Sequence, residues 1–236
     1  MSSSVSAPPN CFRELLERGF EFHVFISWPS HIQDRGRKIV EELAHSLEDR
    51  FKDFRFSKVF WDREALRTEG GKWDAKLRRS LCRSGLMVAV LVPSYFESDY
   101  CRTEWNIMEQ LQGRRLPTAA NETCFLPILL SEEMDLPKEI VDLTYNLSFR
   151  QMLSYGNRVR ASKAWNEVVD ALVSTIKQKL TLLCRALASP PDWAAEEAIA
   201  MDAGPKDFDW SKAMQPNIPA GQARKLPVMG ASGRKL

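Results

Sequence analysis

Short apolar runs alternate with longer amphipathic segments along the chain. Four of the runs are rich in β-branched and aromatic residues, which is typical of buried strands: residues 22–28, 56–61, 85–92 and 124–130. The run at 85–92, GLMVAVLV, is apolar on both faces, as an interior strand of a parallel sheet must be. Pro127 interrupts the last run, which predicts an edge strand or an irregular one.

Between these runs, apolar residues recur at the three- and four-residue spacing of an α-helix. The spacing predicts helices at residues 35–51, 73–81, 99–112 and 164–183. A short entry helix near residue 11, and a short helix and short last strand between 131 and 160, complete the pattern. Strands that alternate with helices predict an α/β fold, here a flavodoxin-like parallel sheet of about five strands flanked by helices.

The same pattern divides the chain into three parts. Residues 1–19 form an N-terminal extension, residues 20–187 a single domain, and residues 188–236 a tail rich in proline and glycine. The tail shows no period, so we expect it to be flexible or to dock on its own domain, a neighbouring copy or a partner. Its isolated tryptophans, Trp193 and Trp210, are candidate anchors for such docking.

Composition narrows the classes of function. The 236 residues are 44% apolar and 27% charged with a formal net charge of +2, so we expect no direct binding to nucleic acid or to a membrane. No apolar run approaches the ~20 residues that a spanning helix needs. The five cysteines are isolated and odd in number, which argues against a disulfide framework and a cysteine-based zinc site. A reducing cytoplasm is the expected setting, and no metal site is predicted.

Several common catalytic motifs are absent. The chain has no GxGxxG after its first strand, no GxxxxGK[ST] and no GxSxG. Its three histidines, His23, His31 and His45, lack the spacing of a metal pair, and His23 in a strand is interpreted as structural. Any catalysis is therefore expected to rest on carboxylates.

The stretch SYFESDYCRTEW, residues 94–105, opens a helix directly after the most apolar run. Tyr100 and Glu104 stand one turn apart in it, so they could hold a ligand together. The alternative is that Glu104 is an ordinary solvated carboxylate. Trp105, with Met108 and Leu111, is interpreted as core.

Together, these segments resemble a Toll/interleukin-1 receptor (TIR) domain. FHVFISW, VFWDREALRTEGGKWDAKLRRSL, SGLMVAVLVPSYFESDYCRTEW and CFLPILL follow one another in that family's order over roughly residues 20–185. The more specific pieces are D-x3-L-x3-G-x2-W at residues 62–73 and S-Y-x-x-S-x-Y-C-x-x-E at residues 94–104, which ends at Glu104. The version here is similar to prokaryotic members, some of which cleave NAD+ between nicotinamide and ribose.

The resemblance implies roles for five residues. Glu104 matches the essential glutamate of the enzymes, and Tyr100 matches an aromatic position at which tryptophan is also frequent. Trp28 and Trp73 match aromatics after the first strand and after the loop glycine, and Asp62 opens that loop. The implied site thus has Glu104 as the catalytic residue and Trp28, Asp62, Trp73 and Tyr100 as substrate-binding residues.

Simple chemistry is consistent with this assignment. Nicotinamide leaves as a neutral molecule, so the group that needs stabilising is an oxocarbenium-like ribose, and a nearby carboxylate does that. Aromatic rings offer flat surfaces for nicotinamide and adenine. Packing roles remain open alternatives, because Trp28 could cap the sheet, Trp73 could pack its loop and Asp62 could bond the loop backbone.

The resulting hypothesis is an NAD+ nucleosidase, either a glycohydrolase or an ADP-ribosyl cyclase, with NAD+ as substrate and no cofactor. It would act in bacterial anti-phage signalling, with self-assembly through the loop at 62–72 and with a separate effector or sensor protein. Water and an internal nucleophile compete for the same ribose carbon, and the sequence leaves hydrolysis and cyclisation open. The alternative is a non-catalytic adaptor that acts through contacts between TIR domains.

Overall fold

A computed structural model of the chain describes residues 11–52, 58–61, 73–117, 122–131, 135–141, 143 and 147–210. Its centre is one sheet of five strands: β1 (Phe22–Ser27), β2 (Val59–Phe60), β3 (Ser84–Leu91), β4 (Phe125–Leu129) and β5 (Leu147–Ser148). Their order is β2-β1-β3-β4-β5, and each neighbouring pair is parallel. The predicted flavodoxin-like α/β fold is therefore confirmed.

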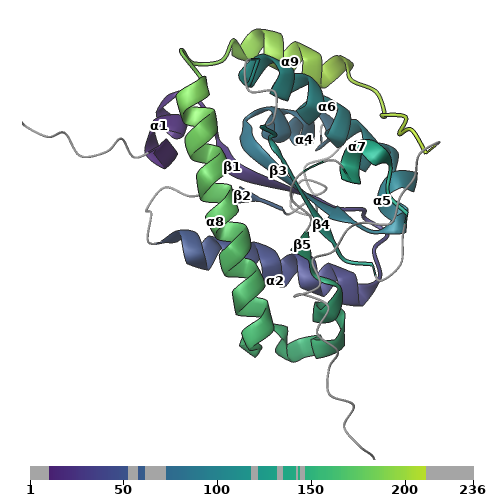
Figure 1. The fold of residues 1–236 in the computed structure, drawn as a ribbon. Coiled ribbons are helices and arrows are strands. Elements are labelled where there is room, and N and C mark those ends of the chain that lie inside the picture. The colour runs from purple at the N-terminus through teal and green to yellow at the C-terminus, as the bar shows by residue number, and fades with distance from the viewer. Residues whose placement is uncertain are drawn as a thin grey trace, which may run out of the picture.

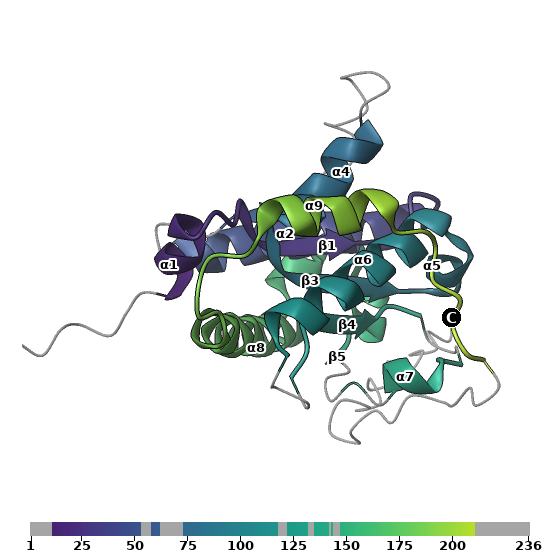
Figure 2. The same cartoon turned by 90° about the horizontal axis from the view of Figure 1, so that it is seen from above.

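Helices cover both faces of the sheet (Figure 1). On one face α1 (Cys11–Glu17), α2 (Asp34–Phe51), the 3₁₀ helix η2 (Arg150–Ala161) and α8 (Lys163–Ala186) pack against one another. On the other face lie α4 (Trp73–Cys82), α5 (Pro93–Glu97), α6 (Asp99–Arg115) and α9 (Trp193–Asp202). The short helix α7 (Lys138–Val141) lies beyond the end of the sheet, as the view from above shows (Figure 2).

Local chemistry explains where the two most informative helices begin. Ser98 precedes α6 and its hydroxyl accepts a hydrogen bond from the Cys101 amide, at 3.4 Å. Ser162 does the same for the Trp165 amide at the start of α8, at 3.1 Å. Serine side chains satisfy the unpaired amides of a first helical turn, so both helices start at a defined residue. The start of α6 in turn places Glu104 in its second turn.

The expectation that Pro127 marks an edge strand is wrong, because β4 lies between β3 and β5. The structure also shows why proline is tolerated there. The Leu129 carbonyl accepts a hydrogen bond from the Phe149 amide, so the backbone of Leu129 faces β5. Residues two apart in a strand direct their backbone groups to the same side, and Pro127 therefore faces β5 as well. Among the described residues the β5 ladder pairs Ile128 and Leu129, so the missing N–H of Pro127 removes none of the ladder bonds seen in that part of the chain.

The pattern of apolar residues did not predict three elements, namely α5, η2 and α9. Helix α9 packs against α4 and α6. Its Glu196 forms an ion pair with Arg115 of α6 at 2.7 Å, and the two side chains are only 3% and 0% exposed. Arg115 also donates to the carbonyls of Ser84 and Cys82. This part of the chain is consequently built into the domain.

The segment that follows α9, residues 203–210, runs along α6 toward α5 (Figures 1 and 2). Arg102 of α6 donates to the Lys206 carbonyl at 2.7 Å, and the Lys206 ammonium bonds the Glu109 carboxylate at 2.7 Å. Phe208 then packs against Phe96 and Trp105, with ring centroids 5.1 and 5.5 Å apart. Of the surfaces considered for the tail, residues 193–210 thus contact their own domain, and residues 211–236 lie outside the described part.

A search of the described residues finds no helix that combines the length and the apolar character needed to span a membrane.

Candidate functional site

The candidate site lies where the sheet changes direction of winding. From β1 the chain proceeds to β2 on one side and then returns to β3 on the other. Ser27, the last residue of β1, is paired in register with Ala89 of β3. The carboxyl ends of these two strands meet at such a switch point, which is where open α/β sheets bind ligands.

Glu104 lies at this point and is only 3% exposed. The Ser27 hydroxyl donates a hydrogen bond to its Oε2, at 2.5 Å. The Ser27 oxygen also lies 3.0 Å from the phenol oxygen of Tyr95, which is fully buried. Because the single Ser27 hydrogen is directed to Glu104, Tyr95 donates to Ser27, and the three groups form a chain that ends on the carboxylate. Glu104 is therefore not the solvated helix carboxylate that the sequence left as an alternative.

Two of the predicted aromatic residues, Tyr100 and Trp28, differ in how exposed they are and in what they contact. Tyr100 is 45% exposed, so it lies at the surface one turn before the buried Glu104. Trp28 is buried, its indole donates to the Trp61 carbonyl at 3.2 Å, and the Arg37 guanidinium lies 5.9 Å from its ring. The indole hydrogen bond ties the ends of β1 and β2 together, which is the capping role considered for Trp28.

The two remaining predicted residues, Asp62 and Trp73, belong to the loop at 62–72 and to the helix that follows it. Asp62 and the whole loop at 62–72 lie outside the described residues. Trp73 is the first residue of α4, but its side chain also lies outside the described part. The structure thus brings together Glu104 and the end of β1, with Tyr100 above them.

Comparison with known proteins decides the family. A family model described as a TIR domain matches residues 24–173, which is more than half of the chain. This chain belongs to the TIR domain family. No curated protein and no solved structure gave a significant match.

Sequence reasoning missed two residues of the site in this TIR domain, Ser27 and Tyr95. Both are fully buried polar groups: Ser27 meets Glu104 across 77 residues of chain, and Tyr95 meets Ser27 across 68. One signal was present, because Ser27 places a hydroxyl at the end of an otherwise apolar strand, at the edge where ligands bind. Tyr95 belongs to the motif at 94–104, but nothing in the sequence indicated that it contacts Ser27.

Other reactive groups of the TIR domain do not form a rival site. Burial raises the pKa of the Cys82 and Cys124 thiols to about 11, so both are protonated and poor nucleophiles at neutral pH. His23 is buried, and this burial lowers its pKa. Its Nε2 bonds the Phe12 carbonyl and its Nδ1 accepts from the Lys58 amide, so it is a neutral structural histidine.

One group of side chains in the described ranges has the spacing to hold a metal ion: Cys11, Glu14 and Cys184, with donor atoms within 4.8 Å of one another. The group lies where α1 contacts α8, at the opposite end of the sheet from Glu104. Cys184 donates to Glu14 at 3.1 Å, and Arg18 bonds the other carboxylate oxygen at 2.5 Å. These hydrogen bonds satisfy the carboxylate without an ion.

The arrangement around Glu104 suits the stabilisation of positive charge. A carboxylate in a poorly hydrated setting interacts strongly with a developing cation. The Ser27 hydroxyl fixes the orientation of the Glu104 carboxylate toward such a cation. The exposed ring of Tyr100 offers a flat surface on the solvent side. A TIR domain with this geometry can act on a ligand that pairs an aromatic ring with a group that becomes cationic.

Proposed function

We propose that this TIR domain cleaves NAD+ at the bond between nicotinamide and ribose, in the cytoplasm and as part of bacterial defence signalling. As the bond breaks, its electron pair leaves with the nicotinamide nitrogen and positive charge develops on the ribose. Glu104 would face that charge, and water or a nucleophile within the substrate would take the vacant position on the ribose carbon. No cofactor is needed for this step, because NAD+ is the substrate.

The observation that carries the proposal is the place and setting of Glu104. It is a buried carboxylate at the switch point between β1 and β3, and the Ser27 hydroxyl holds its Oε2 at 2.5 Å. Burying a carboxylate costs desolvation free energy unless the group is paired or hydrogen-bonded. A functional role for the charge of Glu104 is the simplest explanation for that cost. Tyr100, one helical turn before Glu104 on α6 and 45% exposed, supplies aromatic surface on the solvent side.

The second candidate function is that of a non-catalytic adaptor that binds other TIR domains. One observation favours it: with 3% of its surface exposed and the Ser27 hydroxyl against it, Glu104 offers little area to a ligand in this conformation. An enzyme would have to open this site when NAD+ binds, whereas an adaptor would not. The two functions therefore differ in whether the charge of Glu104 matters.

The test replaces Glu104 with glutamine, which keeps the size of the side chain and removes its charge. We expect nicotinamide release from NAD+ to fall by about 10²-fold or more, the loss typical of one electrostatic group in an active site. Release is measured by chromatography at several protein concentrations, and the ribose product shows whether hydrolysis or cyclisation occurs. Thermal melting confirms that the variant is folded.

Glu109→Gln is the matched control, since Glu109 lies on the same helix but faces outward to Lys206. It should cleave NAD+ at the parental rate. An undiminished rate in Glu104→Gln would exclude the catalytic role of Glu104. Absence of cleavage by the parent at every concentration would favour the adaptor.

A further inference from the structure

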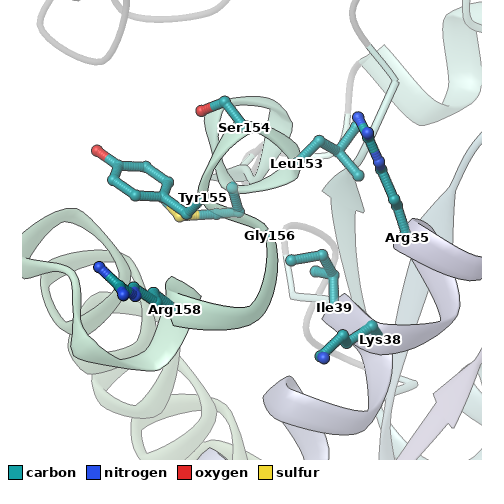
Figure 3. A pocket seen from close by; sticks show the side chains of 9 residues that line it. Arg35, Lys38, Ile39, Leu153, Ser154, Tyr155, Gly156 and Arg158 are labelled. Carbon is teal, nitrogen blue, oxygen red and sulfur yellow. The ribbon is translucent and has the colours of Figure 1, made fainter.

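A cavity lies in the helical layer on the other face of the sheet, between α2 and η2 (Figure 3). Its volume is about 510 Å³, within the usual range for small-molecule sites. The α2 residues that line it belong to the first two turns after β1, and η2 follows β5 directly. The cavity is therefore near the carboxyl edge of the sheet, but Glu104 is not among its lining residues.

Three cationic side chains line this cavity: Arg35 and Lys38 from α2 and Arg158 from η2. In Figure 3 Arg35 and Lys38 extend from α2 on one side of it, and Arg158 lies on the other side. Among the residues that the structure describes, no carboxylate lines the cavity. The described lining residues thus include three cationic side chains and no anionic one.

Arg35 and Arg158 differ from the nearby Arg160, whose side chain forms ion pairs within the domain. Arg160, also on η2, pairs with Asp49 at 2.6 Å and with Glu42 at 3.5 Å. Arg35 and Arg158, in contrast, make no ion pair or hydrogen bond within the described ranges of the chain. Their guanidinium groups remain available to a ligand, and this planar fork suits phosphate oxygens.

The rest of the lining is apolar and aromatic. Ile39 and Met152 form a buried floor, and Tyr155 presents its ring on the same side as Arg158 (Figure 3). A bare inorganic anion would use the cations but not the floor or the ring. A ligand that joins phosphate groups to a flat, partly apolar ring would use all three.

We propose that the cavity between α2 and η2 is a nucleotide-binding site, in which Arg35, Lys38 and Arg158 hold the phosphates and Tyr155 packs against the base. The site is separate from the one that contains Glu104, and the proposal does not depend on NAD+ cleavage. Helix α2 also contacts the end of β1, because Arg37, between Arg35 and Lys38 in sequence, approaches the Trp28 ring.

The test is calorimetric titration of the full chain with ADP, adenosine and inorganic phosphate. We expect ADP to bind at one site, adenosine to show no measurable binding, and phosphate to bind more weakly than ADP. The charge reversals Arg35→Glu and Arg158→Glu together should weaken ADP binding about ten- to a hundredfold, since each removes a charge-assisted hydrogen-bond donor. If the double variant does not fold, Arg158→Gln alone should still weaken binding.

Two controls locate the ADP. Arg185→Glu changes an exposed arginine near the end of α8 that makes no ion pair among the described residues, and it should bind ADP like the parent. Glu109→Gln, the control on α6, should also bind ADP like the parent. The proposal is overturned if ADP does not bind, if adenosine binds as well as ADP, or if the double reversal has no effect.

Discussion

At the level of single residues, the carboxylate of Glu104 is oriented by the protein before any substrate arrives. Ser27 holds it and Tyr95 holds Ser27, with donor–acceptor distances of 2.5 and 3.0 Å. All three groups are buried, so water does not compete for these bonds. Orientation of this kind reduces the reorganisation that the site must undergo when charge develops on a ligand.

Ser27→Ala should therefore slow NAD+ cleavage without removing it. A hydrogen bond to a charged group contributes about 1.5–3 kcal/mol, so we expect kcat to fall about ten- to a hundredfold while KM changes little. Tyr95→Phe should have a smaller effect, because it removes a donor one step away. Steady-state kinetics give both constants, and Ser27→Thr, which retains the hydroxyl, should recover part of the loss.

Parental kcat in Ser27→Ala, or a Ser27→Thr variant that is folded and no better than Ser27→Ala, would show that the hydroxyl only fills space. The sequence was informative about Glu104 because its motif is local, with Tyr100 one turn away. It could not identify the hydroxyl chain, since that chain depends on contacts between residues far apart in sequence. Nor did it reveal how deeply Glu104 is buried.

At the level of elements, α9 shows the limit of reasoning from apolar periodicity. Its buried positions in the middle of the helix are Glu196 and Ala200, one charged and one small, so no apolar stripe marks it as a helix that packs on a domain. The strands and long helices were predictable, because each buries a stripe of large apolar residues. The buried face of α9 is defined by the ion pair between Glu196 and Arg115. These two charges are 81 residues apart, so their pairing is not visible in the sequence.

The pair between Arg115 and Glu196 leads to a stability prediction. Glu196→Ala leaves a buried guanidinium without its carboxylate, so we expect the free energy of unfolding to fall by about 3–5 kcal/mol. Removal of residues 190–236, which takes away Glu196 together with the rest of α9, should cause a loss at least as large. Urea unfolding followed by circular dichroism measures both.

Glu197→Gln is the control for this prediction, since Glu197 is on the same helix but pairs with Arg83 in a more exposed position. Its loss should be about 0–1 kcal/mol, as for other ion pairs near the surface. A Glu196→Ala variant as stable as Glu197→Gln would mean that the carbonyls of Ser84 and Cys82 satisfy Arg115 by themselves.

At the level of the whole molecule, we expect cleavage to depend on self-assembly. The loop at 62–72, which lies outside the described residues, is the segment that the family resemblance assigns to contacts between copies. If a neighbouring copy completes the site, the rate per subunit should rise with protein concentration. Arg67→Glu or Gly70→Pro should abolish this rise and most of the activity.

Nicotinamide release across a dilution series, with particle size followed by light scattering, measures this dependence. Glu104→Gln should assemble normally while remaining inactive, which separates assembly from chemistry. A rate per subunit that is constant while the protein stays monomeric would contradict the requirement for assembly.

The segment at 203–210 also restricts the directions in which such an assembly can grow. It lies along the outward surface of α6, held by Arg102, Asn106 and Glu109. A copy that approaches α6 from outside would meet this segment before it met the helix. Repeated stacking of copies must then use faces that the segment leaves uncovered. The segment at 203–210 would therefore restrict the symmetry of such an assembly. A partner that binds α6 directly would first have to displace residues 203–210 from this helix.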